Sequence, residues 1–169
     1  KAKAFIYYLK GRAYIQKGKL NPEKRKMISA EKNLKRSIRI AEKNPDLNDT
    51  NIRVLAYHEL GRLYYFKNQF KDALGMVEKG LESFVVSDSR QYVKPILQIS
   101  KAIYLEKLDM TLDALKVLEA MWKDINAIHN IQVILNMYET RAVVLGKMYR
   151  HEEAIKYCNK GIEIARINE

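Results

Sequence analysis

The chain has 169 residues, of which 47% are apolar and 30% charged, a composition that is typical of a folded domain and excludes a disordered chain. No apolar run approaches the ~20 residues that span a bilayer, so we expect no membrane segment. The formal net charge of +11 is concentrated at the start, because residues 1–44 hold 14 Lys or Arg against 3 Asp or Glu, whereas residues 45–169 hold 17 of each.

Apolar residues recur at three- and four-residue steps along most of the chain, and breakers are few, with 7 Gly and 3 Pro. In chain order, the pattern predicts helices at roughly 3–18, 28–44, 51–67, 70–83, 91–107, 111–126, 131–148 and 151–167. The breaks between them fall at turn-forming stretches, among them NPDLNDTN, SDSR, LDMT, HN and YRH. Asp49 or Thr50, Ser89 and Asp109 are predicted as N-caps.

Glycines inside these predicted helices indicate a repeat. One stretch has small and aromatic residues at offsets 0, 3, 4, 7, 16 and 20, namely Tyr57, Leu60, Gly61, Tyr64, Ala73 and Val77, followed by Gly80. Degenerate copies are Tyr7, Gly11, Tyr14, Ala30, Leu34 and Ser37; then Ala102, Ala114, Leu118 and Met121; then Tyr138, Ala142, Ala154, Cys158 and Gly161. Because a helical Gly costs about 1 kcal/mol relative to Ala, we expect these small residues where two helices of one repeat pack closely. Gly75 has no such explanation.

The spacing resembles the tetratricopeptide repeat, W-x2-L-G-x2-Y followed by A-x3-F, with a longer period near 40 residues. The resemblance implies an all-α fold, a right-handed α-α superhelix of about four helix pairs whose first helices line a concave face. We expect one repeat domain over 1–169, with repeats at about 1–45, 49–87, 90–127 and 130–169. Because the chain begins KAKAF without Met, we expect it to be a piece of a longer protein.

Catalytic signatures are missing from the sequence. The three histidines, His58, His129 and His151, are scattered, and no HExxH, CxxC, GxSxG or phosphate-binding loop occurs. Cys158 stands at an apolar position of the repeat, which favours a packed, inert thiol. A single cysteine also suits a reducing cytoplasm. We therefore expect no enzyme activity, no metal and no cofactor.

A concave wall of mixed apolar and polar side chains suits a short extended peptide. Placing the repeat pattern on its usual geometry predicts a peptide-binding face that consists of Tyr8, Arg12, Gln16, His58, Arg62, Tyr65, Ile99, Ile103, Asn136 and Glu139. Arg12 and Arg62 are candidates to hold a carboxylate, including a free C-terminus. For any one of these residues, packing between adjacent repeats is the open alternative.

A second candidate site is a basic stripe at helical steps of 4, 3 and 4, formed by Lys32, Arg36, Arg39 and Lys43. Three interpretations stay open: a solvated helix face, a dock for an acidic protein surface, or direct contact with phosphate. No recognition helix or zinc finger is visible, so we expect nucleic acid to be bound only through a domain not present here.

The segments YxxLGxxYY and KDALGMVEKGLE, the long period and the Lys/Asn/Tyr/Ile-rich usage resemble the peptide-pheromone sensors of Gram-positive bacteria, the Rap–Npr–PlcR–PrgX family. This resemblance implies the sensor domain of a cytoplasmic, quorum-sensing transcriptional regulator, with peptide binding coupled to repeat packing or to a homodimer. Kinesin light chains and large maltose-type activators stay open as other long-period arrays. A chaperone-type carboxylate clamp is rejected, because its Lys, Asn and Arg residues are replaced here by Tyr8, Arg12, Glu59, Ile96 and Ser100. The alternative function is a scaffold that docks an acidic partner through the basic first repeat.

Overall fold

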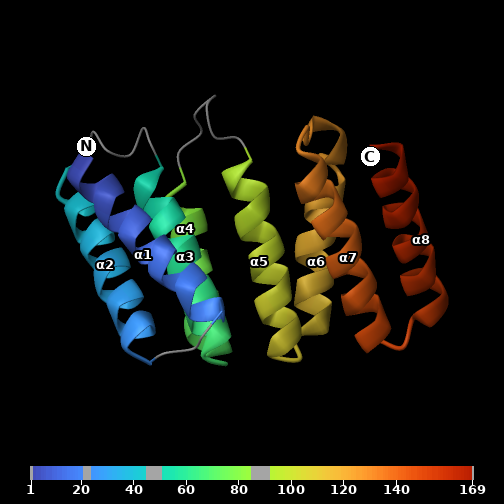
Figure 1. The fold of residues 1–169 in the computed structure, drawn as a ribbon. Coiled ribbons are helices and arrows are strands. Elements are labelled where there is room, and N and C mark those ends of the chain that lie inside the picture. Colours follow the sequence, from blue (N-terminus) through green and yellow to red (C-terminus); the bar gives the residue numbers. More distant parts are fainter. Residues whose placement is uncertain (1, 21–23, 45–50, 85–91, 169) are drawn as a thin grey trace. The chain divides into compact units, whose positions relative to one another are not determined.

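The computed structural model describes residues 2–20, 24–44, 51–84 and 92–168. Within these ranges the chain forms eight α-helices and one short 3-10 helix, with no β-strand, which confirms the predicted all-α class (Figure 1). None of the described helices is both long and apolar enough to cross a membrane.

The chain divides into two compact units, Lys1–Gln91 and Tyr92–Glu169. The first unit contains α1 (Ala2–Leu20), α2 (Lys24–Glu42), α3 (Ile52–Phe66) and α4 (Phe70–Glu82). The second contains α5 (Val93–Lys107), α6 (Thr111–Trp122), η3 (Ile125–Ala127), α7 (Ile131–Lys147) and α8 (His151–Ile167). Two of the sequence-based predictions, a single domain over residues 1–169 and a right-handed superhelix, describe the chain as a whole. Both stay predictions.

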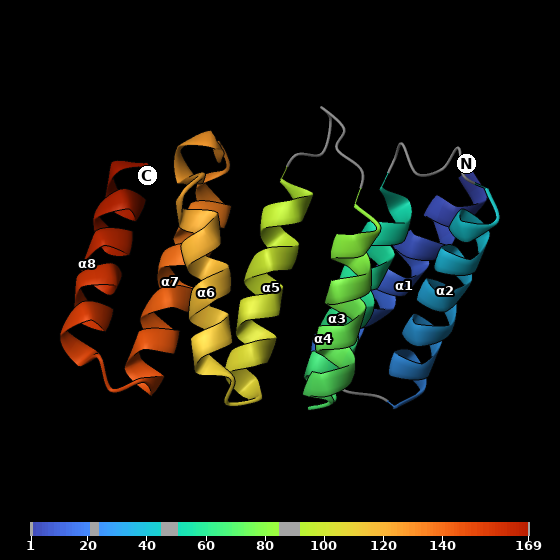
Figure 2. The same ribbon diagram turned by 180° about the vertical axis from the view of Figure 1, so that it is seen from behind.

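Successive helices in each unit pack as pairs, α1 with α2 and α3 with α4, then α5 with α6 and α7 with α8. In the first unit, α1 and α3 contact one another on one face, and α2 and α4 lie on the opposite face (Figures 1 and 2). The second unit repeats this arrangement, with α5 contacting α7. The first helices of neighbouring pairs therefore form one continuous face within each unit.

The helix boundaries agree with the prediction to within a few residues. The largest differences are in the second helix, which begins at Lys24 rather than near 28, and in α6, which ends at Trp122 rather than near 126. After Trp122 the chain turns into the 3-10 helix Ile125–Ala127. Asn130 then caps α7, and its side-chain oxygen accepts a hydrogen bond from the Val133 N–H at 3.1 Å. This cap satisfies one of the free N–H groups of the first turn.

Three of the connections within pairs are the same turn. A central residue adopts a left-handed conformation in each, at Asn68 (φ 57°), Asp109 (φ 60°) and Tyr149 (φ 59°). The residue that follows donates its N–H to the carbonyl five positions back, as Gln69 to Tyr64, Met110 to Leu105 and Arg150 to Leu145. This is a Schellman motif, which satisfies the last carbonyls of the first helix. The same turn therefore reverses the chain between α3 and α4, between α5 and α6, and between α7 and α8.

The prediction that Asp109 is an N-cap is wrong. Asp109 occupies the left-handed position of this turn, and Met110 precedes the first residue of α6 without a side-chain cap. The Asp109 carboxylate instead accepts a hydrogen bond from Nζ of Lys147 at 2.9 Å. Asp and Asn tolerate the left-handed region better than other non-glycine residues, which explains an aspartate here. The other predicted caps, Asp49, Thr50 and Ser89, lie outside the described residues.

Close helix packing explains Gly11 and Gly161, which lie inside helices. A Cβ atom built on Gly11 of α1 lies 2.5 Å from Cγ of Leu34 and 3.3 Å from the carbonyl oxygen of Ala30, both on α2. A Cβ on Gly161 lies 3.3 Å from Cβ of Tyr138. These contacts confirm that the small residues of the repeat allow the paired helices to approach. Among the residues that the structure describes, nothing lies within 4 Å of a Cβ built on Gly75, so its presence has no packing explanation.

Candidate functional site

We call the face formed by the first helices of each unit its inner face, and in the first unit a buried carboxylate lies between α1 and α3 on this face. Glu59 on α3 is 4% exposed, and Nη1 of Arg62 donates to its two oxygens at 3.0 and 2.9 Å. Nε of Arg12, on α1, lies 3.7 Å from the same carboxylate. The structure thus brings together the two arginines that the sequence predicts to hold a carboxylate. It also shows that they already share an internal one.

His58 lies beside this group and is held neutral. Desolvation, together with the positive charges of Arg62 and then Arg12, lowers the pKa of His58 from 6.5 to about 4. Two guanidinium groups and one carboxylate leave about one unit of net positive charge, and a neutral imidazole adds none. The group of Arg12, Arg62 and Glu59 is therefore net positive at neutral pH, and His58 is a neutral hydrogen-bonding group beside it.

The other predicted residues of this unit differ in how much surface they offer. Gln16 is exposed, and Tyr65 is half-buried with its ring 5.6 Å from the ring of Phe70. Tyr8 is only 5% exposed and stacks on Phe5 at 6.0 Å between ring centroids, so it lies mainly in the core. A role for these residues in ligand binding stays a prediction.

In the second unit, the predicted residues lie on the two first helices, α5 and α7. Ile99 is 5% exposed and belongs to the core, Ile103 and Asn136 are half-buried, and Glu139 is exposed. The Asn136 side-chain oxygen accepts a hydrogen bond from Gln132 at 2.9 Å. Their contact with a ligand also stays a prediction.

A second buried carboxylate lies at the end of this inner face. Glu106 on α5 is 3% exposed, and Nζ of Lys147 on α7 lies 3.1 Å from its carboxylate. Lys147 also donates to the Glu106 carbonyl oxygen and to Asp109, both at 2.9 Å. Each unit therefore joins its two first helices through a buried Glu and a cation from the neighbouring repeat.

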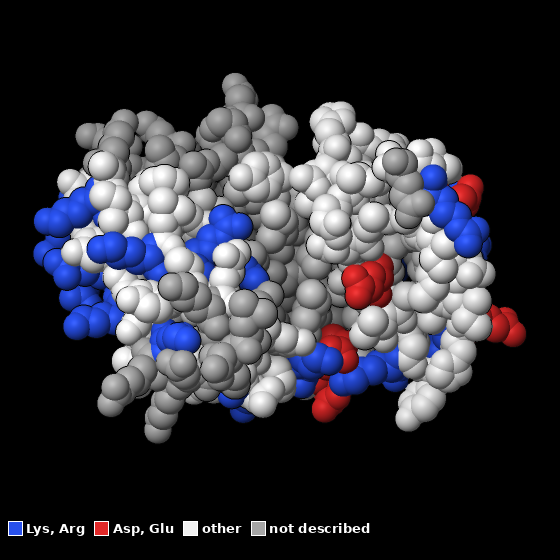
Figure 3. Space-filling model, viewed as in Figure 1, with Lys and Arg blue, Asp and Glu red and all other residues white. Residues whose placement is uncertain are grey.

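The four residues of the predicted basic stripe, three on α2 and Lys43 directly after it, are all exposed. The guanidinium of Arg36 lies 4.4 Å from the ring centroid of Tyr7 on α1, which favours one orientation of the cation. Lys3 and Lys10 of α1 are exposed as well, and Figure 3 shows Lys and Arg gathering on the edge of the first unit that α1 and α2 form. We call Lys3, Lys10, Lys32, Arg36, Arg39 and Lys43 the basic face. Among the described residues, none of the six has an ion-pair partner.

Sequence reasoning missed an aromatic cluster in the second unit. The rings of Trp122, Tyr138 and Tyr157 contact one another, with centroids 4.8 to 6.0 Å apart. The guanidinium of Arg141 lies over Trp122 at 4.9 Å and over Tyr157 at 4.6 Å. A pocket of about 670 Å³ adjoins the cluster and is lined mainly by α8. Only the register of α6, α7 and α8 shows this site, because the three aromatic residues are far apart in sequence.

The prediction of a packed thiol at Cys158 is also wrong, because this cysteine is exposed. Ile155 and Ile162 on the same helix are 59% and 50% exposed. At the matching repeat positions Val77 and Leu118 are fully buried, whereas the described residues leave this face of α8 exposed.

One segment of the chain matches a known family. Residues 135–168, which comprise most of α7, its turn and α8, match the family model described as tetratricopeptide repeat. No curated protein and no solved structure matches the chain. The match and the all-helical fold of consecutive pairs support a tetratricopeptide repeat domain. A repeat of this class indicates interaction with a protein or a peptide.

Proposed function

We propose that this domain is a peptide sensor of a cytoplasmic regulator, and that it binds a short peptide on the face formed by its first helices. The observation that carries the proposal is the Glu59 group, in which Arg12 and Arg62 share one buried carboxylate. Because the two arginines exceed their internal partner by one charge, a peptide carboxylate gains a charge-assisted contact there. Glu59 holds the Arg62 guanidinium in place before the ligand arrives, which reduces the ordering cost of binding.

The kind of regulator rests on the sequence resemblance to the peptide-pheromone sensors. On that basis the ligand is a secreted peptide of about 5–8 residues, and the output is transcriptional control in quorum sensing through a domain outside this chain. The proposed role is binding without catalysis. A bound peptide stabilises the conformation that it prefers, by mass action.

Native mass spectrometry tests the proposal, with the chain exposed to small peptides from its host's spent growth medium. A stable adduct of peptide mass is the expected result, and it identifies the ligand. The double variant Arg62→Ala with Tyr65→Ala should lose most of the affinity, and an amidated C-terminus on the peptide should weaken binding to wild type. As a control, Lys116→Ala on the exposed surface of α6 should bind normally. No adduct with a folded chain, or equal binding by the double variant, would contradict the proposed site.

A second candidate function is supported by the basic face. Its six cations have no acidic partner among the described residues, which favours a scaffold that docks an acidic protein. Charge reversal at Arg36 and Arg39 should then abolish partner binding and leave peptide binding unchanged. Loss of both activities together would instead indicate damage to the fold of the first unit, which circular dichroism would detect.

A further inference from the structure

The outer surface of α1 carries an apolar stripe that the described residues leave exposed. Its members are Ala2, Ile6, Leu9 and Ala13, at steps of 4, 3 and 4, which is the spacing of a helix-packing seam. All four are exposed, with Ile6 at 48% and Leu9 at 44%. We call these four residues the α1 seam.

The same repeat positions on α3 show what such a seam packs against. Ile52, Ala56, Glu59 and Leu63 lie fifty residues after the members of the α1 seam, and each is at most 4% exposed. Three of them, Ile52, Ala56 and Leu63, belong to the core that α3 shares with α1 and α2. In the second repeat, this face is therefore covered by helices. The equivalent face of α1 has the shape and spacing to accept one.

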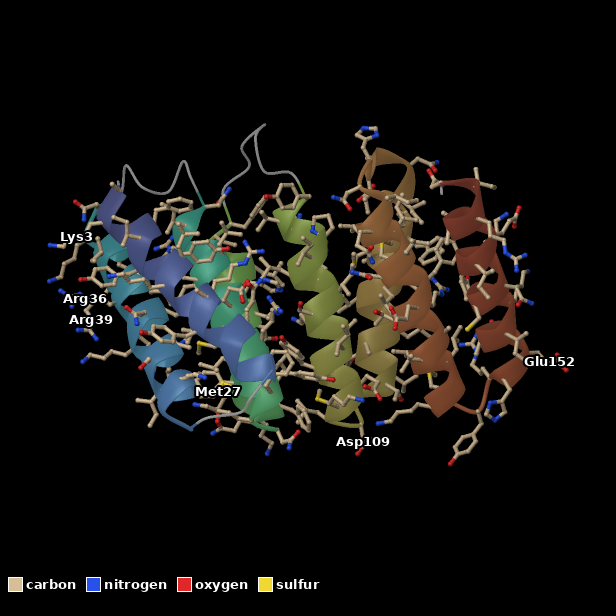
Figure 4. The ribbon with its side chains drawn as sticks, in the orientation of Figure 1. Lys3, Met27, Arg36, Arg39, Asp109 and Glu152 are labelled. Atoms are coloured by element: carbon tan, nitrogen blue, oxygen red, sulfur yellow. The ribbon has the colours of Figure 1, made fainter. Side chains whose placement is uncertain are left out.

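Positive charges lie beside the α1 seam and determine which charge a helix that packs on the seam should carry. Lys3 and Lys10 lie about a quarter turn from the seam on α1, at 100° per residue. Arg36, on the adjacent α2, rests on the Tyr7 ring between the two helices, and Figure 4 shows Lys3, Arg36 and Arg39 along one edge of the unit. Helix α1 itself contains no acidic residue. An occupant of the seam consequently meets several cations along one side.

We propose that the α1 seam and the basic face together dock an amphipathic helix with an apolar stripe and an acidic flank. The inference rests on the second candidate function and names its partner class. A helix is favoured over a phosphate backbone because a nucleic acid would neutralise the cations and leave Ile6 and Leu9 uncovered. It is favoured over an extended acidic segment because the seam repeats at helical steps and its counterpart on α3 is covered by helices.

The test uses a synthetic peptide of about 18 residues, which as a helix of ~1.5 Å per residue spans most of α1. It carries Leu at seam spacing and Glu at the flanking positions, and binding is followed by fluorescence anisotropy of a labelled copy. Two control peptides have the same composition scrambled, so that the stripe is lost, or Lys in place of every Glu. The seam peptide should bind at least tenfold more tightly than either control, with affinity that falls as salt rises.

Protein variants locate the site. The double variant Ile6→Asp with Leu9→Asp should lower the affinity for the synthetic peptide with Leu at seam spacing, the seam peptide, at least tenfold. The double variant Arg36→Glu with Arg39→Glu should lower it by a similar factor. The matched control is Ile155→Asp on α8, which changes an isoleucine that is 59% exposed and should leave binding unchanged. Because every altered side chain is exposed, these variants should keep the wild-type circular dichroism spectrum.

The outcomes separate this inference from the function on which it rests. Equal binding of the scrambled Glu peptide, or of duplex DNA, would support a general site for polyanions and overturn the helix. Failure of every acidic peptide to bind the folded chain would overturn both the helix and the acidic-partner function. Equal loss in the Ile155→Asp control would show that the seam peptide binds elsewhere.

Discussion

Gly11 and Gly75 form a matched pair that tests why the helices of this domain contain glycine. Each lies inside a helix, so replacement by Ala should gain about 1 kcal/mol of helix propensity at either site. At Gly11 the new Cβ would lie 2.5 Å from Cγ of Leu34, which is fully buried. Cγ is a branch atom rather than a flexible end, so relief requires α1 and α2 to move apart. Overpacking of this kind costs about 1–3 kcal/mol, and we expect the upper part of that range.

Gly11→Ala should therefore lower the free energy of unfolding by about 2 kcal/mol. Gly75→Ala should raise it by about 1 kcal/mol, because no described atom lies within 4 Å of a Cβ built at position 75. Urea titration followed by circular dichroism measures both changes, and the two midpoints should differ by more than about 1 M. If Gly11→Ala were as stable as wild type, close packing would not be the reason for this glycine. A destabilised Gly75→Ala would show that its site is constrained by something other than side-chain space.

The remaining predictions concern charge and backbone conformation. Burial raises the pKa of Glu31, but hydrogen bonds from Lys35, Lys67 and Tyr64 outweigh this effect and lower the pKa to about 2. The stability that this group contributes is therefore present above pH 4.5 and is lost as the pH falls toward 2. In urea titrations, Glu31→Gln should lower the free energy of unfolding by about 2 kcal/mol at neutral pH but change it little near pH 2. Because the pKa of His58 is lowered to about 4, folding should become less favourable as pH falls from 6.5 to 4, and NMR titration should show His58 neutral at pH 5. A midpoint near 6.5 would show that His58 is solvated. Tyr149 is 85% exposed at φ 59°, so Tyr149→Gly should raise the free energy of unfolding by about 1 kcal/mol in urea, whereas Asn68→Gly should change it less.

The sequence predicted the fold well because the fold follows from local spacing. The twelve-residue step from Ala102 to Ala114 recurs from Ala142 to Ala154, and in both pairs a three-residue turn joins the helices. The position of Asp109 was mispredicted because an aspartate between two helices suits either an N-cap or a left-handed turn. Only the hydrogen bond from Met110 to Leu105 distinguishes the two.

The candidate site was less predictable, because it depends on the register between helices. Arg12 and Arg62 were selected from their repeat positions, but their shared partner Glu59 requires α1 and α3 to be placed side by side. The one available signal was the three-residue step from Glu59 to Arg62, which places both on one helix face. The cluster of Trp122, Tyr138 and Tyr157 had no comparable local signal, since each ring comes from a different helix.

The pairing of charges separates the cations that support the fold from those that are free to meet a partner. On the inner faces, Arg62 binds the buried carboxylate of Glu59 within α3, and Lys147 on α7 binds that of Glu106 on α5, so much of their charge is neutralised inside the fold. The basic face has no such internal partner among the described residues, although it holds much of the positive charge of residues 1–44. Uncompensated like charges repel one another and weaken a fold. Cations without an internal acidic partner are therefore the stronger indication of a binding partner, and here they border the exposed apolar seam of α1.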